Sequence, residues 1–325
     1  FHGDSSVNPK AFDGLLKVIK DSASNTDVAE KNRATVIDAG GKQIGEDGLG
    51  YDFFNEVAEK VMGKGGDLNE AYFPLPVAQQ FYKLWNDKLR FIVGEKNAMA
   101  NLERLPNLPT ATGSIIKIQE NGTGIDKQFK VKGKVVAAGD RKRRPNAPTT
   151  VAVSANASVS DSAFTEAYAG DYVYEVFAVN SYGISGGTKA AAPVAVAVGG
   201  SVTVTITPDT NGEEATGYII CRSKAGGTET MEMCRIRATR DANTVFTDLN
   251  NDLPGTTEII LLSSKTQELM DNLSFAQLMP ISSFELPRDS SWAHRGTVAL
   301  YGTPELRAPE LCAVVKNLGY AGGLY

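Results

Sequence analysis

The 325-residue sequence has few of the residues on which metal sites and disulfide frameworks depend. Its three cysteines, Cys221, Cys234 and Cys312, show no C-x-x-C spacing, so they indicate neither a zinc site nor a disulfide framework and favour a reducing compartment. The histidines are His2 and His294, and neither has a second ligand at metal-binding spacing. We therefore expect no metal and no cofactor.

Catalytic motifs are also missing. The chain has no G-x-S-x-G motif, and the triad letters of Asp289-Ser-Ser-Trp-Ala-His294 all fall on one short segment, whereas triad members converge from separate elements. The glycines of Gly63-Lys-Gly-Gly66 do not lead into G-K-[ST], so they indicate a helix end and a turn instead of a phosphate-binding loop. We expect a protein that is not an enzyme.

Long apolar runs and an excess of positive charge are absent too. No run of about 18 apolar residues exists, so we expect no contact with a membrane. The 33 basic residues against 38 acidic ones give a formal charge of −5, which argues against a protein whose main surface binds nucleic acid. A hydrophobic content of 42% is typical of a globular protein, and the length allows two domains.

What is present begins with helical patterns in the first hundred residues. A helix is predicted after Asn8, a second from Tyr51 to a stop at Gly63, and a third from about Pro76. We expect their aromatic side chains to pack into a core. The apolar stripe of the first helix consists of Phe12, Leu15, Leu16 and Ile19.

From residue 114 the pattern changes to short β-rich runs, at residues 115–118 and 129–136. The basic run Arg141, Lys142, Arg143 and Arg144 then precedes two prolines, which is typical of a domain boundary. Residues 146–263 follow with about seven short alternating strands, a pattern that predicts an antiparallel β-sandwich.

After the sandwich, the capping-box spacing of Ser264-Lys-Thr-Gln267 predicts a helix that leads to Leu273. Two strands then close the chain, with Pro304 and Pro309 expected in their connection, because proline removes a ladder donor. These strands need partners from far upstream. We therefore expect one α+β domain, formed by residues 1–145 and 264–325, that the sandwich of residues 146–263 interrupts.

The sandwich resembles fibronectin type III and immunoglobulin-like modules. The stretch "YVYEVFAVNSYGIS" is similar to their Y-x-V-x-A-V-N strand and the turn after it, and "GYIICRS" is similar to their Y-x-I-x-R strand. The order differs from that family, since here the A-V-N strand comes first. The resemblance implies an all-β immunoglobulin-like domain.

The rest of the chain resembles the major capsid proteins of large tailed phages of the myovirus type, which have the Hong Kong 97-type fold. The closing stretch "TVALYGTPELRAPELCAVVKNLGY" is similar to their last strands, and it departs from them at residues 303–305 by a proline. The stretches "FHGDSSVNPKAFDGLLKVI", "NRATVIDAGGKQI" and "LNEAYFPLPVAQQFYKLWND" agree in the same order. The positions that match the family pattern include Asp4, Phe12, Asp13, Gly14, Tyr301, Gly302, Ala308, Pro309, Lys316 and Asn317.

This resemblance implies a structural virion protein that self-assembles into the hexamers and pentamers of an icosahedral head around double-stranded DNA. Its partners would be other copies, decoration, portal and scaffolding proteins, and packaged DNA through weak non-specific contact. Assembly would take place in the host cytoplasm and the product would be the virion. Under this hypothesis the candidates for inter-subunit ion pairs are Arg141, Lys142, Arg143, Arg144, Arg288, Arg295 and Arg307.

Several alternatives remain open at this stage. The basic run of Lys127, Lys130, Lys132 and Lys134, which continues in residues 141–144, is either a solvated strand face with a linker or a contact with acidic neighbours. Those neighbours would be a partner subunit's carboxylates or the phosphates of packaged nucleic acid. The chain begins with Phe1, and the family's amino-terminal arm, extended loop and spine helix do not precede it, so we expect a processed, trimmed or partial chain that does not build a complete shell by itself. A surface-binding protein whose sandwich recognises carbohydrate or protein is the main rival function, and an enzyme with an accessory β-domain is the third.

Overall fold

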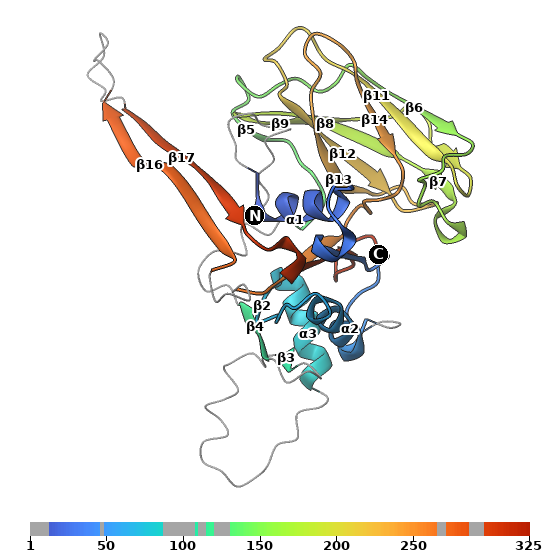
Figure 1. Cartoon of the computed structure of the whole chain (residues 1–325). Helices are drawn as coiled ribbons and strands as arrows, with labels where there is room; N and C mark the ends of the chain where they lie inside the picture. The colour runs from blue at the N-terminus through green and yellow to red at the C-terminus, as the bar shows by residue number, and fades with distance from the viewer. Residues whose placement is uncertain are drawn as a thin grey trace.

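The computed structural model describes residues 13–45, 49–86, 108–109, 115–119, 131–264, 271–285 and 296–325. Figure 1 shows three parts: a body with the helices, a sandwich of strands above it, and a long two-stranded ribbon that projects to one side. Most of the regular structure in these residues is β-sheet, and α1–α3 supply the α-helix. The chain is therefore an α+β protein that is rich in sheet.

The body is built on one sheet whose strands come from distant parts of the sequence. β1 runs parallel to β18, and β15 lies antiparallel between β18 and β2. In this sheet, strands from the early and the late segments of the chain lie side by side. The order across the sheet is β1 (Thr35–Asp38), β18 (Cys312–Leu318), β15 (Thr257–Leu262), β2 (Glu70–Tyr72), β4 (Ile115–Gln119) and β3 (Leu108–Pro109).

Helices cover both faces of this sheet, because its central strands alternate buried side chains between the two faces. Ile259 and Leu261 of β15 pack with α2 (Tyr51–Met62) and α3 (Leu75–Asn86), while Ile260 and Leu262 pack with α1 (Leu15–Ser24). All three predicted helices are present. α2 ends at Gly63 as expected, and Gly14 is the N-cap of α1, whereas Asn8 and Phe12 lie outside the described residues.

The sandwich has two sheets around one apolar core, which the alternation of the sequence predicted. Buried tyrosine and aliphatic side chains from both sheets meet in this core, among them Tyr174, Val204 and Ile220. One sheet has the order β14 (Thr244–Asp248), β11 (Ser201–Thr207) and β6 (Thr150–Asn156). The other has the order β13 (Thr230–Arg237), β12 (Gly217–Ser223), β8 (Tyr174–Asn180), β9 (Gly183–Lys189) and β5 (Ala138–Gly139). A separate pair is formed by β7 (Gly170–Tyr172) and β10 (Val194–Val196).

The boundaries of the sandwich differ from the predicted 146–263. β5 precedes residue 146 and pairs with β9, so the sandwich begins earlier. At the other end, β15 falls within the predicted range but pairs with β18 and β2, so it belongs to the body. All six residues of β15 are buried. A strand that is buried on both faces has no alternation of apolar and polar residues, so its sequence does not show that the sandwich has ended.

Two predicted elements near the joints of the domains are wrong. Residues 131–136, expected in a strand, form none; Val135 instead packs on the outer face of β8 and β12, against Phe177, Ile219 and Cys221. Leu273, expected at the end of a helix, is the first residue of strand β16, and residues 265–270 lie outside the described part. Val135 thus serves tertiary packing instead of the predicted strand.

The two closing prolines have different places. Pro309 begins the short 3-10 turn η5 (Pro309–Leu311) before β18, as predicted for a connection. Pro304, also expected in that connection, lies within strand β17 opposite Phe275. A strand can hold this proline because both strands of a two-stranded ribbon are edge strands.

Candidate assembly surface

The ribbon is the part of the molecule that is least covered. It consists of β16 (Leu273–Glu285) and β17 (Gly296–Leu306), which pair antiparallel with each other and with no other described strand. Figure 1 shows it extending away from both the body and the sandwich. A two-stranded ribbon is marginally stable alone in water, so this one calls for a further surface to pack on.

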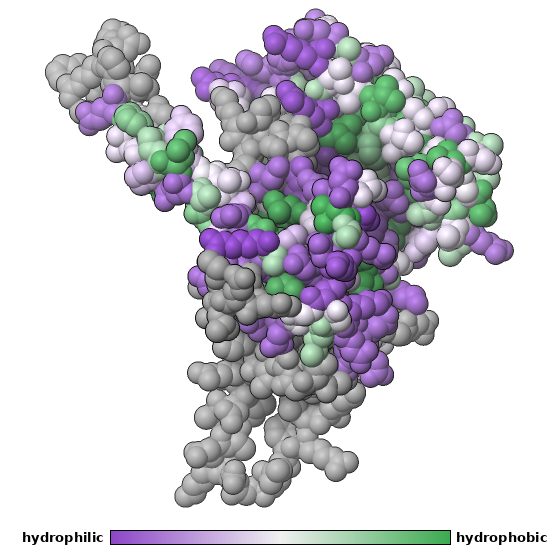
Figure 2. All heavy atoms as spheres, viewed as in Figure 1, coloured by the Kyte–Doolittle hydropathy of each residue, from purple (hydrophilic) through white to green (hydrophobic). Residues whose placement is uncertain are grey.

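Large apolar side chains are concentrated on the ribbon. Eight of the fourteen exposed large hydrophobic side chains in the described residues lie there, and Leu278 is 90% exposed and Val298 69%. Figure 2 shows these green residues between the purple ones along the ribbon. The set is Leu273, Phe275, Leu278, Ile281, Phe284, Val298, Leu300 and Tyr301.

One face of the ribbon is apolar along β17. Because successive side chains of a strand point to opposite faces, Val298, Leu300, Pro304 and Leu306 share a face. At the root of the ribbon, Leu306 packs against the body's cluster beneath α1. The apolar face is therefore a continuation of a core that the body has already formed.

Gly302 shapes this face. A side-chain Cβ at Gly302 would collide with the ring of Phe275 on the opposite strand. The glycine therefore lets the aromatic ring lie across the ribbon. This gives a physical reason for one of the residues that matched the capsid pattern.

The edges of the ribbon are poorly suited to pairing with a further strand. The register shifts twice between Gln277 and Ser282, so β16 carries extra residues there, with Pro280 among them. Bulges and prolines twist an edge and remove donors, which hinders the addition of further strands. We infer that the apolar face, and not the edge, is the surface available for packing.

The root of the ribbon is fixed by Asn272, a buried residue that the sequence analysis did not identify. Its side-chain amide donates to the carbonyl oxygens of Ser263 (3.1 Å) and Ala308 (3.2 Å), and its Oδ1 accepts from the backbone N–H of Ala308 at 2.8 Å. These bonds join both ends of the ribbon to the strands of the body.

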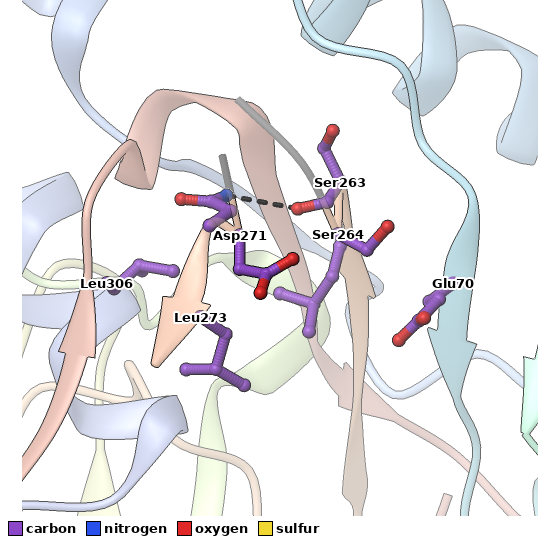
Figure 3. A pocket seen from close by; sticks show the side chains of 8 residues that line it. Glu70, Ser263, Ser264, Asp271, Leu273 and Leu306 are labelled. Atoms are coloured by element: carbon purple, nitrogen blue, oxygen red, sulfur yellow. Dashed lines mark hydrogen bonds between the residues drawn. The ribbon is translucent and has the colours of Figure 1, made fainter. Parts of the chain in front are cut away.

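A cavity of about 210 Å³ lies beside this root. Figure 3 shows Glu70 from β2, Asp271, Leu273 and Leu306 around it, with Ser263 and Ser264 directly after the end of β15. The two carboxylates have no third ligand, and no group of three or more His, Cys, Asp or Glu residues in the described part could hold a metal ion.

Lys316 and Asn317, also part of the capsid pattern, connect β18 to its surroundings. Asn317 has a positive φ of 54°, and its side-chain amide lies 2.9 and 3.0 Å from the carboxylate oxygens of Asp38 and 3.0 Å from the Asn251 carbonyl. Lys316 pairs with the same carboxylate at 3.3 Å. Asn317 also accepts from the backbone N–H of Leu253 at 2.9 Å. These contacts are structural, since they join β1, β18 and the segment that leaves the sandwich.

The remaining pattern positions have varied roles. Gly14 caps α1, Asp13 pairs with Lys17 at 3.7 Å, and Tyr301 is exposed on the ribbon. Asp4 and Phe12 lie outside the described residues.

The candidate inter-subunit cations occupy two places. Arg141 to Arg144 form a turn after β5, where the guanidinium of Arg143 lies 5.1 Å from the ring centre of Tyr182, and Arg307 is exposed at the end of β17. Within the described residues none of these five side chains makes an ion pair, so they are free to pair with another molecule. Arg288 and Arg295 lie outside the described residues.

In contrast, the sandwich buries a charged cluster at its core. Arg222 is fully buried; its guanidinium donates to Asp248 at 2.5 Å and to Asn250 at 2.6 Å, and it stacks on Tyr172 at 4.8 Å. Burial and the neighbouring Asp248 carboxylate, which accepts from the Tyr174 hydroxyl at 2.6 Å, raise the pKa of Tyr174 well above its usual value. Arg222, Asp248 and Asn250 of this cluster are all buried.

Comparison with known proteins adds no identification: no family model matches the sequence, and no curated protein matches it. No helix in the described part of the chain has the length and apolar character needed to cross a membrane.

Proposed function

We propose that this chain is a structural subunit of a shell, namely a major capsid protein of the Hong Kong 97 type that self-assembles into the hexamers and pentamers of a phage head around double-stranded DNA. The observation that carries the proposal is the apolar face of the β16–β17 ribbon. It leaves large hydrophobic side chains in water on a projecting element that is unstable by itself. In an obligate assembly, a neighbouring subunit would bury such a face.

The dimensions of the ribbon suit this role. A strand of 13 residues spans about 40 Å. Interfaces of obligate assemblies are large and more apolar than those of transient complexes. Closed symmetry then repeats one contact around every ring of subunits, so a single apolar face serves many copies.

The order of the elements supports the same proposal. The sequence resemblance covers the segments that form β1, β2 and β18, and in the fold these three strands share one sheet. An inserted sandwich that enters and leaves through neighbouring segments leaves that sheet intact. Under this proposal the sandwich lies on the outside of the shell, where decoration proteins or neighbouring subunits contact it.

The unpaired cations extend the proposal to the partners. Arg141 to Arg144 and Arg307 would pair with carboxylates of a neighbouring copy, and scaffolding and portal proteins would contact the same assembled rings. The net charge of −5 suits weak, non-specific contact with packaged DNA instead of tight binding. The site of action would be the virion, after assembly in the host cytoplasm.

The rival function, recognition of carbohydrate or protein by the sandwich, has less support. The cavity on the sandwich is lined by Lys134, Glu175, Lys189, Glu229 and their neighbours, and no aromatic side chain is among them. Ligand pockets are mostly lined by apolar and aromatic groups, whereas the apolar side chains that line this one are only Val135 and Met231.

Negative-stain microscopy of the complete gene product tests the proposal. We expect rings or closed particles of regular size. A monodisperse monomer at high concentration would overturn it, and glycan binding by that monomer would favour the rival.

A further inference from the structure

A glycine-rich segment lies at the seam between the sandwich and the body. We name residues 319–325, which follow β18, the seam strap. Figure 1 shows the C-terminal end of the chain at this seam. Neither the fold of the body nor the proposed function explains why this segment lies there.

The strap interlocks with both neighbours through pairs of glycines. A Cβ on Gly319 would collide with the backbone oxygen of Gly41 in the body, and a Cβ on Gly323 would collide with the backbone oxygen of Gly255. Gly255 itself has a positive φ of 65° and lies on the segment that leaves the sandwich. Such close approach between backbones requires residues without a side chain.

Three residues of the strap contact different parts of the molecule. Tyr320 is buried in the body's core. Leu324 lies beside Gly255, where a Cβ on Gly255 would meet both the backbone nitrogen of Leu324 and the Met231 sulfur of the sandwich at 2.9 Å. Tyr325 lies between the two domains. Its ring centre is 6.3 Å from that of Tyr168 in the sandwich.

Tyr325 also contacts the body. Its carbonyl oxygen accepts from Gln43 Nε2 at 3.1 Å, and a Cβ on Gly41 would meet its ring at 2.9 Å. On the sandwich side, Lys224 Nζ lies 5.1 Å from the centre of the same ring. One residue therefore touches the sandwich and the body at once.

Without the strap, the two domains are joined mainly by two crossing segments, residues 131–137 and 249–256. These pair with each other and with the sandwich through the bonds from Lys132 N to Thr256 O (3.2 Å) and from Gly255 N to Glu232 O (3.1 Å). Domains joined by neighbouring linkers move relative to one another unless a substantial interface holds them. The Tyr168 hydroxyl of the sandwich also donates a hydrogen bond to the Gly40 carbonyl of the body at 2.7 Å. The strap lies beside this contact.

We propose that the seam strap fixes the orientation of the inserted sandwich on the body, and that its release turns the two crossing segments into a hinge. This inference does not depend on shell assembly. Gly319 and Gly323 would have a conformational role, because each faces a glycine of a different segment, Gly41 or Gly255.

Hydrogen exchange of the full chain with Gly323→Val tests the proposal. We expect the Gly255 and Lys132 amides to exchange at least about tenfold faster, while protection in β8, β11 and β12 is unchanged. Gly186→Val is the matched control, because Gly186 has no atom within 4 Å of its Cβ position. Equal acceleration throughout the sandwich and body would mean general destabilisation and would overturn the proposal.

A second variant keeps the test valid if Gly323→Val does not fold. Tyr325→Ala removes the side chain between the domains, and Tyr182→Ala, on an exposed tyrosine of the sandwich, is its control. We expect small-angle scattering to show a larger maximum dimension for Tyr325→Ala alone. Unchanged scattering and unchanged exchange at Gly255 in this variant would contradict the role of the strap.

Discussion

Strand β11 of the sandwich and strand β17 of the ribbon carry the same kind of pattern and have opposite environments. In β11, Val202, Val204 and Ile206 are fully buried, whereas Val298 and Leu300 on one face of β17 are 69% and 42% exposed. The sandwich provides a second sheet that covers β11, and no described part of the chain covers the ribbon. An alternating strand therefore specifies a face to be buried, but not whether its own chain buries it.

Charged residues show the same contrast in reverse. The sandwich encloses Arg222 with its partner Asp248, while Arg141 to Arg144, in the turn after β5, and Arg307, at the end of β17, make no ion pair within the described residues. The buried charge therefore has its counter-ion inside the chain, whereas these cations are left for another molecule.

The largest effect is expected where the sandwich depends on its internal partner. Arg222→Ala leaves Asp248 buried without its counter-ion, which costs about 3–5 kcal/mol of unfolding free energy. Urea denaturation followed by fluorescence measures the change. Arg240→Ala is the control, because Arg240 is 83% exposed in its ion pairs and should leave stability unchanged. Equal losses in the two variants would contradict the distinction between closed and open surfaces.

A matched pair of valines tests the comparison of the strands directly. Val204→Ala should lower the unfolding free energy by about 2 kcal/mol, since the side chain is fully buried. Val298→Ala should change it by less than about 0.5 kcal/mol in the monomer, because the side chain is exposed. Both values come from urea denaturation at low protein concentration. A loss at Val298 as large as that at Val204 would mean that the ribbon is already buried within one chain.

The smallest effect concerns pH and the joint between the domains. Lys132 Nζ lies 3.4 Å from Asp252 and 3.9 Å from Glu258. Burial opposes the charge of Asp252, but Lys132, Lys20 and Lys316 outweigh it and lower the pKa of Asp252 below its ordinary 3.8. The stabilisation is therefore complete above pH 3.8 and is lost as the pH falls through the lowered value.

Thermal unfolding between pH 2 and 7, with Asp252→Asn as the comparison, measures this contribution. We expect the variant to be less stable at pH 7 and the difference between the two proteins to shrink in acid. A constant difference across this range would contradict the assigned ion pair.

Much of the fold could be predicted because the pattern is local. The apolar spacing from Phe54 to Val61 and the stop at Gly63 define α2, and the alternation of residues 201–207 defines β11. In both elements the buried side chains repeat with the period of the structure itself.

What could not be predicted depends on distant partners. Arg222 and Asp248 are separated by 26 positions, and nothing near Arg222 marks it as buried. β15 reads as one more strand after the sandwich, and only its pairing with β18 places it in the body. Pro304 is allowed in a strand because β17 has a free edge, which no local rule reveals.

The candidate surface was not foreseen from the sequence. Tyr301 and Gly302 were named only as positions of the family pattern, and the apolar face follows from the register of β16 against β17. Asn272, which fixes the root, has no sequence signal beyond a polar residue before an apolar strand.

Sedimentation velocity of the full chain tests the central claim, that the ribbon's apolar face is an assembly surface, most directly. The comparison is between the unaltered chain, Val298→Lys on the ribbon and Val245→Lys on a valine of the sandwich that is also mostly exposed, at 59% against 69% for Val298. We predict concentration-dependent oligomers for the unaltered chain and for Val245→Lys, and association weakened by at least about tenfold for Val298→Lys, because a charge would have to be buried. Identical sedimentation of all three proteins would contradict the claim.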